Sequence, residues 1–235
     1  MKAIGLSTLG PSTALRIRDL PVPVLRPSGV LVKVKACGRQ IALALAFALG
    51  ASMAGAGPVE DGIAAFERGD YATVLRLWRP LAEHGEVRAQ FTLGFMYYSG
   101  HGVAQDYAEA LHWFRAAAVQ GDADAQDRLG MMYSLGRGVA QDYQEERQWY
   151  GKAAAQGHPA AQFQLGYIYA SGRGVTADPV EAFKWYRLAA AQTTDPETRD
   201  AAGRAQATLA AHMTVEQLAT AQHRAHDWKS LPGAR

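Results

Sequence analysis

Three successive segments of this chain, 87–122, 123–158 and 159–194, repeat one pattern at a spacing of 36 residues. Each carries a Leu-Gly-x-x-Tyr motif, then a Gly-x-Gly-Val motif, then a tryptophan followed by a second aromatic residue. A period of this length is typical of an array in which each unit buries its apolar face on its neighbour. Residues that recur in every unit are therefore explained first by packing. Functional residues are expected among those that do not recur.

Each unit is predicted to contain two helices. In the first unit these are expected at about Arg88–Ser99 and Tyr107–Gln120, with equivalents in the next two units. In the second helix Ala110, Phe114 and Ala117 fall at i, i+4 and i+7, which is the spacing of one buried helical face. The sequence therefore predicts an all-α array of helix pairs.

Glycines recur at two places in each unit. Gly94, Gly130 and Gly166 lie inside the first helix of their units, where glycine costs about 1 kcal/mol relative to alanine. Their repetition predicts a close crossing with the second helix. The Gly-x-Gly-Val motifs are predicted to be the turns between the two helices. No Lys-Ser or Lys-Thr pair follows them, as a phosphate-binding loop would require.

The complete pattern resembles the Sel-one-like repeat (SLR), a branch of the tetratricopeptide family. The residues that carry the resemblance follow the order A-x-A-Q-x-x-L-G-x-x-Y-x-x-G-x-G-V-x-x-D-Y-x-x-A-x-x-W-[FY]-x-x-A-A-x-Q-G across the three units. It implies an all-α fold, an α-solenoid of antiparallel helix pairs in a right-handed superhelix. Residues 57–86 resemble a shorter tetratricopeptide-type cap. Residues 195–235 are predicted to hold two capping helices, about Asp200–His212 and Thr214–Trp228, and a tail.

Residues 39–56 have the pattern of a secretory signal peptide. The apolar run Ile41–Ala54 follows basic residues and precedes a small-x-small site that ends at Ala56. The run is shorter than the roughly 20 apolar residues that span a bilayer. We expect cleavage after Ala56 and a periplasmic or secreted protein without a membrane span. The alternative is a cytoplasmic protein, if Met1 is the true start and export fails.

Residues 1–38 resemble the first strands of medium-chain, zinc-type alcohol dehydrogenases. They share an opening Met-Lys-Ala, an Asp-x-Pro-x-Pro turn and a Val-x-Val-x-Ala-x-Gly strand. In that family a cysteine at the place of Cys37 is a metal ligand. The resemblance stops at Gly38, and nothing downstream supplies the other ligands or a dinucleotide-binding turn. A fused or mis-started reading frame is predicted, in which this segment is not part of the mature protein and Cys37 has no catalytic role.

The charge of the repeat region is acidic although the whole chain has a formal net charge of +2. Seven of the 24 basic residues but only one of the 22 acidic residues precede Gly57. From Gly57 onward 17 basic residues face 21 acidic ones, a net charge of −4. This balance argues against nucleic acid as a partner. The single cysteine, Cys37, also precedes Gly57, so no disulfide and no cysteine-based metal site is expected in the repeats.

The resemblance implies a concave surface formed by the first helix of each unit, where a peptide or protein binds. The side chains predicted there vary between units, and many are aromatic or apolar, as in interaction sites. The alternative is that several of them pack on the adjacent unit. The predicted groove residues are Arg88, Phe91, Phe95, Tyr98, Asp124, Asp127, Met131, Leu135, Phe163 and Tyr167.

Two further sets of residues stand out because they are charged. His101, Arg137 and Arg173 occupy equivalent places in the three Gly-x-Gly turns, where we expect solvated side chains. Glu146 and Arg147 replace an apolar pair that the other units carry at the same position. They are expected either to reach solvent or to form ion pairs.

The leading functional prediction is a non-catalytic scaffold or adaptor of the bacterial envelope, monomeric, that binds an unidentified protein or peptide. The alternative is a β-lactam-binding or hydrolysing enzyme, as in cysteine-rich SLR relatives, but this chain lacks their paired cysteines. No catalytic group and no cofactor is predicted, because no nucleophile has a base and an orienting partner. No metal site is predicted either, since His223 and His226 beside Asp227 have no further ligands.

Overall fold

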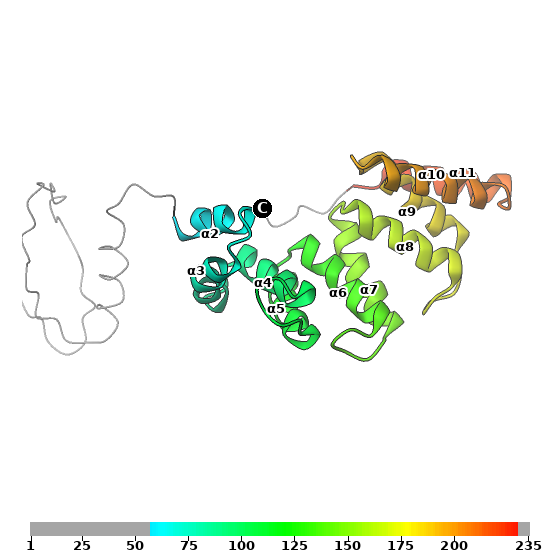
Figure 1. Ribbon diagram of the computed structural model, residues 1–235. Coiled ribbons are helices and arrows are strands. Elements are labelled where there is room, and N and C mark those ends of the chain that lie inside the picture. Colours follow the sequence, from blue (N-terminus) through cyan, green and yellow to red (C-terminus); the bar gives the residue numbers. More distant parts are fainter. Residues whose placement is uncertain (1–56, 230–235) are drawn as a thin grey trace, which may run out of the picture. The chain divides into compact units, whose positions relative to one another are not determined.

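The computed structural model describes residues 57–229 of the chain, and in this part every regular element is a helix. Figure 1 shows the helices following one another as adjacent pairs. The predicted signal peptide and the dehydrogenase-like segment lie outside the described residues. The helices are α2 (Pro58–Glu67), α3 (Tyr71–Glu83), α4 (Val87–Ser99), α5 (Tyr107–Val119), α6 (Ala123–Leu135), α7 (Tyr143–Ala155), α8 (Pro159–Ser171), α9 (Pro179–Gln192), α10 (Pro196–Ala210) and α11 (Val215–Asp227).

The three repeats are the helix pairs α4–α5, α6–α7 and α8–α9. Within a repeat the first helix packs against the second, and the second helix also packs against the first helix of the next repeat. The prediction of an all-α array is therefore confirmed for the described residues. In the first repeat, the predicted start of the first helix and the predicted end of the second helix each differ from the observed ones by one residue. Among the described residues no helix is long and apolar enough to cross a membrane.

The glycines inside α4, α6 and α8 lie where the two helices of a repeat cross. A Cβ atom added at Gly94 would lie 2.7 Å from the ring of Phe114. The same atom at Gly130 would lie 2.7 Å from Tyr150, and at Gly166 it would lie 2.8 Å from Tyr186. All three distances are shorter than van der Waals contact. The predicted close crossing is confirmed in all three repeats, and it is equally close in each.

The Gly-x-Gly motifs are turns, as predicted. The first glycine of each motif ends the first helix of its repeat in the left-handed conformation, with φ of 74° at Gly100 and 66° at Gly136. The second glycine also has a positive φ, and at Gly138 any side chain would collide with the carbonyl group of Tyr107 in the preceding repeat. Glycine is needed here both for its conformation and for this close approach.

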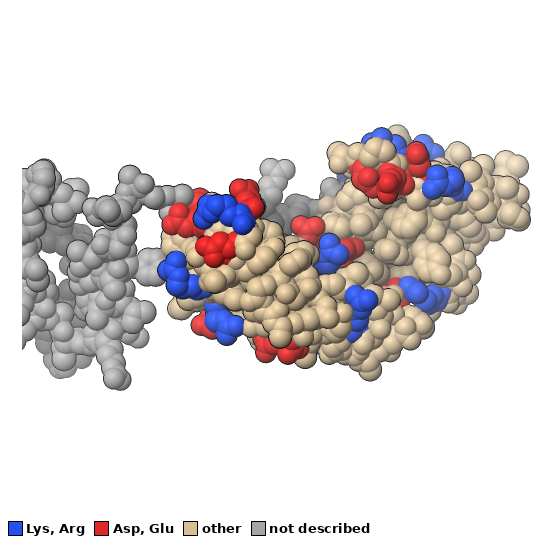
Figure 2. All heavy atoms as spheres, in the orientation of Figure 1, with Lys and Arg blue, Asp and Glu red and all other residues tan. Residues whose placement is uncertain are grey.

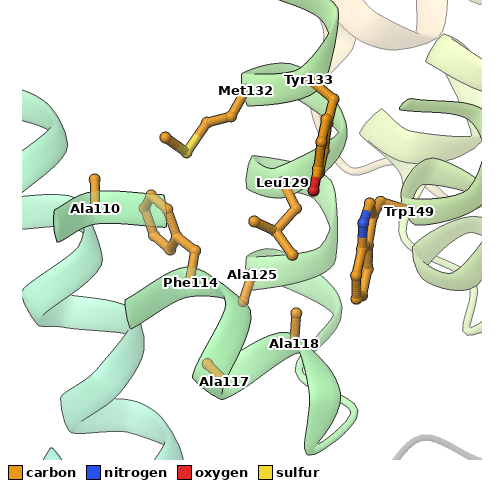
Figure 3. Close-up of a cluster of buried hydrophobic side chains, with 9 residues drawn as sticks. All are labelled: Ala110, Phe114, Ala117, Ala118, Ala125, Leu129, Met132, Tyr133 and Trp149. Atoms are coloured by element: carbon orange, nitrogen blue, oxygen red, sulfur yellow. The ribbon is translucent and has the colours of Figure 1, made fainter. Parts of the chain in front are cut away.

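The tryptophan–aromatic pairs of the first two repeats each join two successive cores. On α5, Trp113 packs into the cluster that holds Trp78 and Leu93, while Phe114 packs into the next cluster. That second cluster lies between α5, α6 and α7, and its side chains point toward one another (Figure 3). Truncating such a buried ring to alanine costs about 3–5 kcal/mol. The recurring aromatic pairs are therefore the main packing link between neighbouring repeats. The cluster in Figure 3 consists of Ala110, Phe114, Ala117, Ala118, Ala125, Leu129, Met132, Tyr133 and Trp149.

A buried glutamine near the start of each first helix adds a polar link between units. Gln126 on α6 is 4% exposed, and its Nε2 donates a hydrogen bond to the carbonyl oxygen of Ala118 on α5 at 3.0 Å. Its Oε1 accepts a hydrogen bond from Gln156 at 2.8 Å. Because buried polar groups are costly when unpaired, this arrangement fixes how the end of one helix pair meets the start of the next.

The two ends of the array are capped by the remaining helices. At the N-terminal end α2 and α3 pack together, and Trp78 Nε1 donates a hydrogen bond to the carbonyl oxygen of Pro58 at 3.2 Å. At the C-terminal end α10 and α11 pack against α9. The capping box predicted at Thr214 and Gln217 is confirmed. Helix α10 begins four residues earlier than predicted, because Asp195 caps it and a proline occupies its first turn.

Candidate binding groove

A groove of about 890 Å³ lies over the starts of α4 and α6. It brings together three of the predicted site residues, Arg88, Phe91 and Asp124, which are separated by up to 36 positions in the sequence. This volume is within the range of pockets that bind small ligands or side chains. The groove is lined by Val59, Gly85, Glu86, Val87, Arg88, Phe91, Thr92, Gln120, Asp122 and Asp124.

An adjoining hollow of about 270 Å³ has an aromatic lining. It is bounded by Phe66, Phe91, Thr92, Phe95 and Arg128. Phe91 lines both spaces. Its ring is partly buried, and its centroid lies 5.6 Å from that of Phe114 in the core. An apolar side chain entering the groove would therefore meet a ring that the core already holds in place.

Other predicted groove residues lie apart from this groove or are used in packing. Tyr98 and Met131 face each other across two repeats, with the Tyr98 hydroxyl 3.9 Å from the Met131 sulfur. Phe163 lines a separate hollow of about 240 Å³ beside α10. Leu135 and Tyr167 are 53% and 45% exposed. Some of the predicted groove residues therefore lie in the groove on the first two repeats, and the others lie elsewhere.

The expectation that the turn residues are solvated is wrong for Arg137 and Arg173, which are partly buried, whereas His101 is exposed. Arg137 lies over two rings of the preceding repeat, 5.4 Å from the centroid of Tyr98 and 5.3 Å from that of Tyr107, and it donates a hydrogen bond to the Tyr98 hydroxyl. His101 stacks in the same way on Tyr71 and Phe95. Because each turn folds back on the previous helix pair, its middle residue meets aromatic rings in addition to water.

Glu146 forms the ion pair that was one of its two predicted alternatives. The residue is fully buried in α7, and Arg173 from the turn of the third repeat donates a hydrogen bond to it. Arg173 also donates to Ser134 Oγ at 3.1 Å and lies 5.0 Å from the ring centroid of Tyr143. Burial raises the pKa of Glu146, and the charge of Arg173 acts against that rise. This pair lies between helices and joins the second repeat to the third.

His158 forms a second polar junction between these repeats. It caps α8, with its Nδ1 accepting a hydrogen bond from the backbone N–H of Ala161 at 3.2 Å. Its Nε2 lies 3.0 Å from Asp124 Oδ1, and its Nδ1 lies 3.8 Å from Asp127 Oδ1. Since Nδ1 accepts from the backbone, the ring proton belongs on Nε2, from which it is donated to Asp124.

The pKa values in this junction move in different directions. Burial acts to lower the pKa of His158, but the hydrogen bond to Asp124 and the charges of Asp127 and Asp124 outweigh it and raise the pKa. The bond to His158 lowers the pKa of Asp124, whereas burial raises the pKa values of Asp122 and Asp127. The groove therefore ends at a cluster of interacting charges.

Charged side chains elsewhere on the surface are mixed in sign. On the face seen in Figure 2, lysine and arginine lie beside aspartate and glutamate, and broad areas carry neither. Within residues 57–229 no three His, Cys, Asp or Glu side chains are placed to hold a metal ion. His223 pairs only with Asp227, at 2.9 Å, and both are exposed.

Comparison with known proteins identifies the repeats. The family model described as "Sel1 repeat" matches residues 87–122, 123–158 and 159–193. The crystal structure of a Sel1 repeat protein from Oxalobacter formigenes is 41% identical, with a TM-score of 0.50, over 55% of this chain and 97% of that one. This chain belongs to the Sel1-repeat family.

A second solved Sel1-repeat structure is more distant. It is described as a protective antigen present in uropathogenic Escherichia coli strains that displays an SLR fold. The identity is 28% and the TM-score 0.49, over 67% of this chain, and the match spans 40% of that protein. In all, 26 chains of solved structures match significantly. No curated protein matches.

The three Sel1 repeats differ from one another at the groove positions. The place of Arg88 in the first repeat is taken by Asp124 in the second and by alanine in the third. The helix-capping residue that precedes it is Glu86, then Asp122, then His158. Because the residue types at these positions change from repeat to repeat, their role is not the same in each repeat. The same positions line or border the groove. In the sequence, His158 is marked only by this change from an acidic capping residue to histidine, and the recurring motifs do not include that position.

Proposed function

We propose that this Sel1-repeat chain is a non-catalytic scaffold that binds a peptide or protein segment in the groove over α4 and α6. The observation that carries the proposal is the groove itself, about 890 Å³, lined by side chains that change from repeat to repeat. Phe91 gives it a ring held by the core, which suits an anchor for a partner side chain. The Sel1-repeat family is also in general one of protein-interaction scaffolds, which supports this function.

We further propose that the protein acts in the bacterial envelope, after removal of residues 39–56 as a signal peptide. The support is the apolar run that follows basic residues and ends at a small-x-small site. Cell fractionation and N-terminal sequencing of the exported protein test this location. A mature chain that begins at Gly57 is expected, and one that retains Met1 would contradict it.

The binding function is tested by co-purification from native envelope extracts with quantitative mass spectrometry. The test variant is Phe91→Ala, which removes the aromatic anchor from the groove. The control is Val119→Ala, a change at an apolar side chain on α5 that is 69% exposed. We expect the control to recover the same partners as the unchanged chain, and the test variant to recover far less of at least one. Equal recovery by both variants would overturn the proposal, provided that circular dichroism shows both to be folded.

A further inference from the structure

Carboxylates dominate the charge of the groove. Of the residues that line it, Glu86, Asp122 and Asp124 are acidic and Arg88 alone is basic. The starts of α4 and α6 also face it, and each helix start carries about half a positive charge. Together the two helix starts offset about one of the three carboxylates, and Arg88 offsets another. Counted over the residues that line it, the groove keeps a net negative charge, and His158 and Arg128 lie beyond this lining.

The three carboxylates are not equally available to a ligand. Glu86 accepts a hydrogen bond from the backbone N–H of Ala89 at 2.5 Å, and Asp122 accepts one from Ala125 at 2.7 Å. Both are therefore committed to capping their helices. Asp124 caps nothing, and its side chain is 67% exposed. Its Oδ1 accepts from His158, and within residues 57–229 its other oxygen has no hydrogen-bond donor.

Asp127 lies one helical turn from Asp124 on α6, so the two side chains share a face. Its side chain is 13% exposed and takes part in no hydrogen bond within the described part of the chain. Burial raises the pKa of Asp127, and the charges of His158 and Arg128 only partly oppose that rise. An additional cation nearby would stabilise the ionised form of such a mostly buried carboxylate, because opposite charges attract.

We propose that the groove binds a segment of a partner protein that presents a lysine or arginine to Asp124, with Asp127 one turn away adding negative charge beneath it, and an apolar side chain to Phe91. This proposal rests on the proposed function and names the chemistry of its ligand. A basic side chain supplies a donor to the Asp124 oxygen that has none among the described residues. The partly buried ring of Phe91 and the adjoining aromatic hollow take the neighbouring apolar side chain. Acidic segments are disfavoured by the same carboxylates, which gives the groove selectivity.

Selection from a library of random nine-residue peptides, displayed on phage and panned against the full-length chain, tests the proposal. Recovered peptides are synthesised, and their Kd values are measured by fluorescence anisotropy for four proteins. These are the unchanged chain, Asp124→Asn with Asp127→Asn, Phe91→Ala, and the control Asp200→Asn on α10, outside the groove. Asparagine at position 124 can still accept the hydrogen bond from His158, so circular dichroism is expected to show an unchanged fold.

We expect the recovered peptides to carry a lysine or arginine next to an apolar residue. Their Kd is expected to rise at least about tenfold with the double Asp→Asn variant, as for the loss of a close charge pair, and to stay the same with Asp200→Asn. Two results would overturn this inference and leave the proposed function standing. One is a set of peptides whose Kd depends on Phe91 but that carry no basic residue. The other is a set whose Kd depends on Phe91 but is unchanged by the Asp→Asn substitutions. If no recovered peptide depends on Phe91 or on the two aspartates, both proposals fail.

Discussion

Arg173 in the turn of the third repeat donates a hydrogen bond to Glu146, which is fully buried in the second helix of the second repeat. The other two repeats have alanine at the place of Glu146. The second repeat instead has an acidic residue at this buried position, and its basic partner follows 27 positions later. The pair therefore acts as one unit, in which Arg173 compensates the buried charge of Glu146.

Removing the cation alone is expected to be far more damaging than removing both charges. Arg173→Met leaves Glu146 buried without a partner, which typically costs about 3–5 kcal/mol of unfolding free energy. The double variant Glu146→Ala, Arg173→Met is expected to recover much of that loss, since alanine is the residue of the other repeats. Urea unfolding followed by circular dichroism measures both. A double variant as unstable as Arg173→Met would show that the ion pair is not the reason for the loss.

Two glycines in the second repeat provide a matched test of close packing. A Cβ at Gly130 in α6 would lie 2.7 Å from the ring of Tyr150, whereas a Cβ at Gly151 in α7 would meet no atom within 4 Å. Gly130→Ala is expected to lower the unfolding free energy by about 1–2 kcal/mol, because overpacking outweighs the gain in helix propensity. Gly151→Ala is expected to raise it by about 0.5–1 kcal/mol. If both changes had the same sign in urea unfolding, the close crossing would not be what excludes a side chain at position 130.

The stacking of Arg137 is expected to contribute to the junction of the first two repeats. Arg137→Ala removes the cation from Tyr98 and Tyr107, a loss of about 1–2 kcal/mol. Arg137→Lys is expected to restore only part of it, because lysine lacks the planar group that stacks on a ring. Arg187→Ala, at an exposed position on α9, is the control. Thermal melting compares the three variants, and equal melting temperatures would place Arg137 in solvent, as the sequence had suggested.

The fold can be predicted from the sequence because the residue patterns that indicate it are local and occur three times. The glycines at 94, 130 and 166 indicated a close crossing before any partner was known, and the structure supplies Phe114 as the partner of the first. Helix limits followed from the same repetition. The predicted starts of α4 and α11 lie within one residue of the observed ones, whereas α10 begins four residues earlier than predicted, since its cap and proline stand outside the repeat pattern.

The site was less predictable because its contacts cross from one repeat to the next. Tyr98 was expected in the groove, but it is covered by Arg137, which lies 39 positions later. No local pattern indicates which turn residue reaches back onto which ring. The link between His158 and Asp124 likewise spans 34 positions. Arg88, Phe91 and Asp124 line one groove because they lie near the starts of successive first helices.

The last prediction concerns pH and the junction at His158. The pKa of His158 is raised in the folded state because Asp124 and Asp127 together outweigh its burial and the opposing charge of Arg128. Folding therefore favours the protonated ring. The resulting stabilisation is fully present below the ordinary histidine pKa of about 6.5, and it is lost as the pH rises through the higher pKa of the folded state.

His158→Asn isolates this effect, because asparagine also caps helices well but does not titrate. We expect the unfolding free energy of the unchanged chain, relative to this variant, to be constant below the ordinary histidine pKa of about 6.5, to fall as the pH rises through the higher pKa of the folded state, and then to level off. Protonation at Nδ1 gives up the hydrogen bond from Ala161 and gains the attraction of Asp127, so NMR titration of the His158 ring should be accompanied by a shift of the Ala161 amide signal. A pH-independent difference in stability, or a ring that titrates at or below about pH 6.5, would mean that the loss of the cap outweighs the two aspartates.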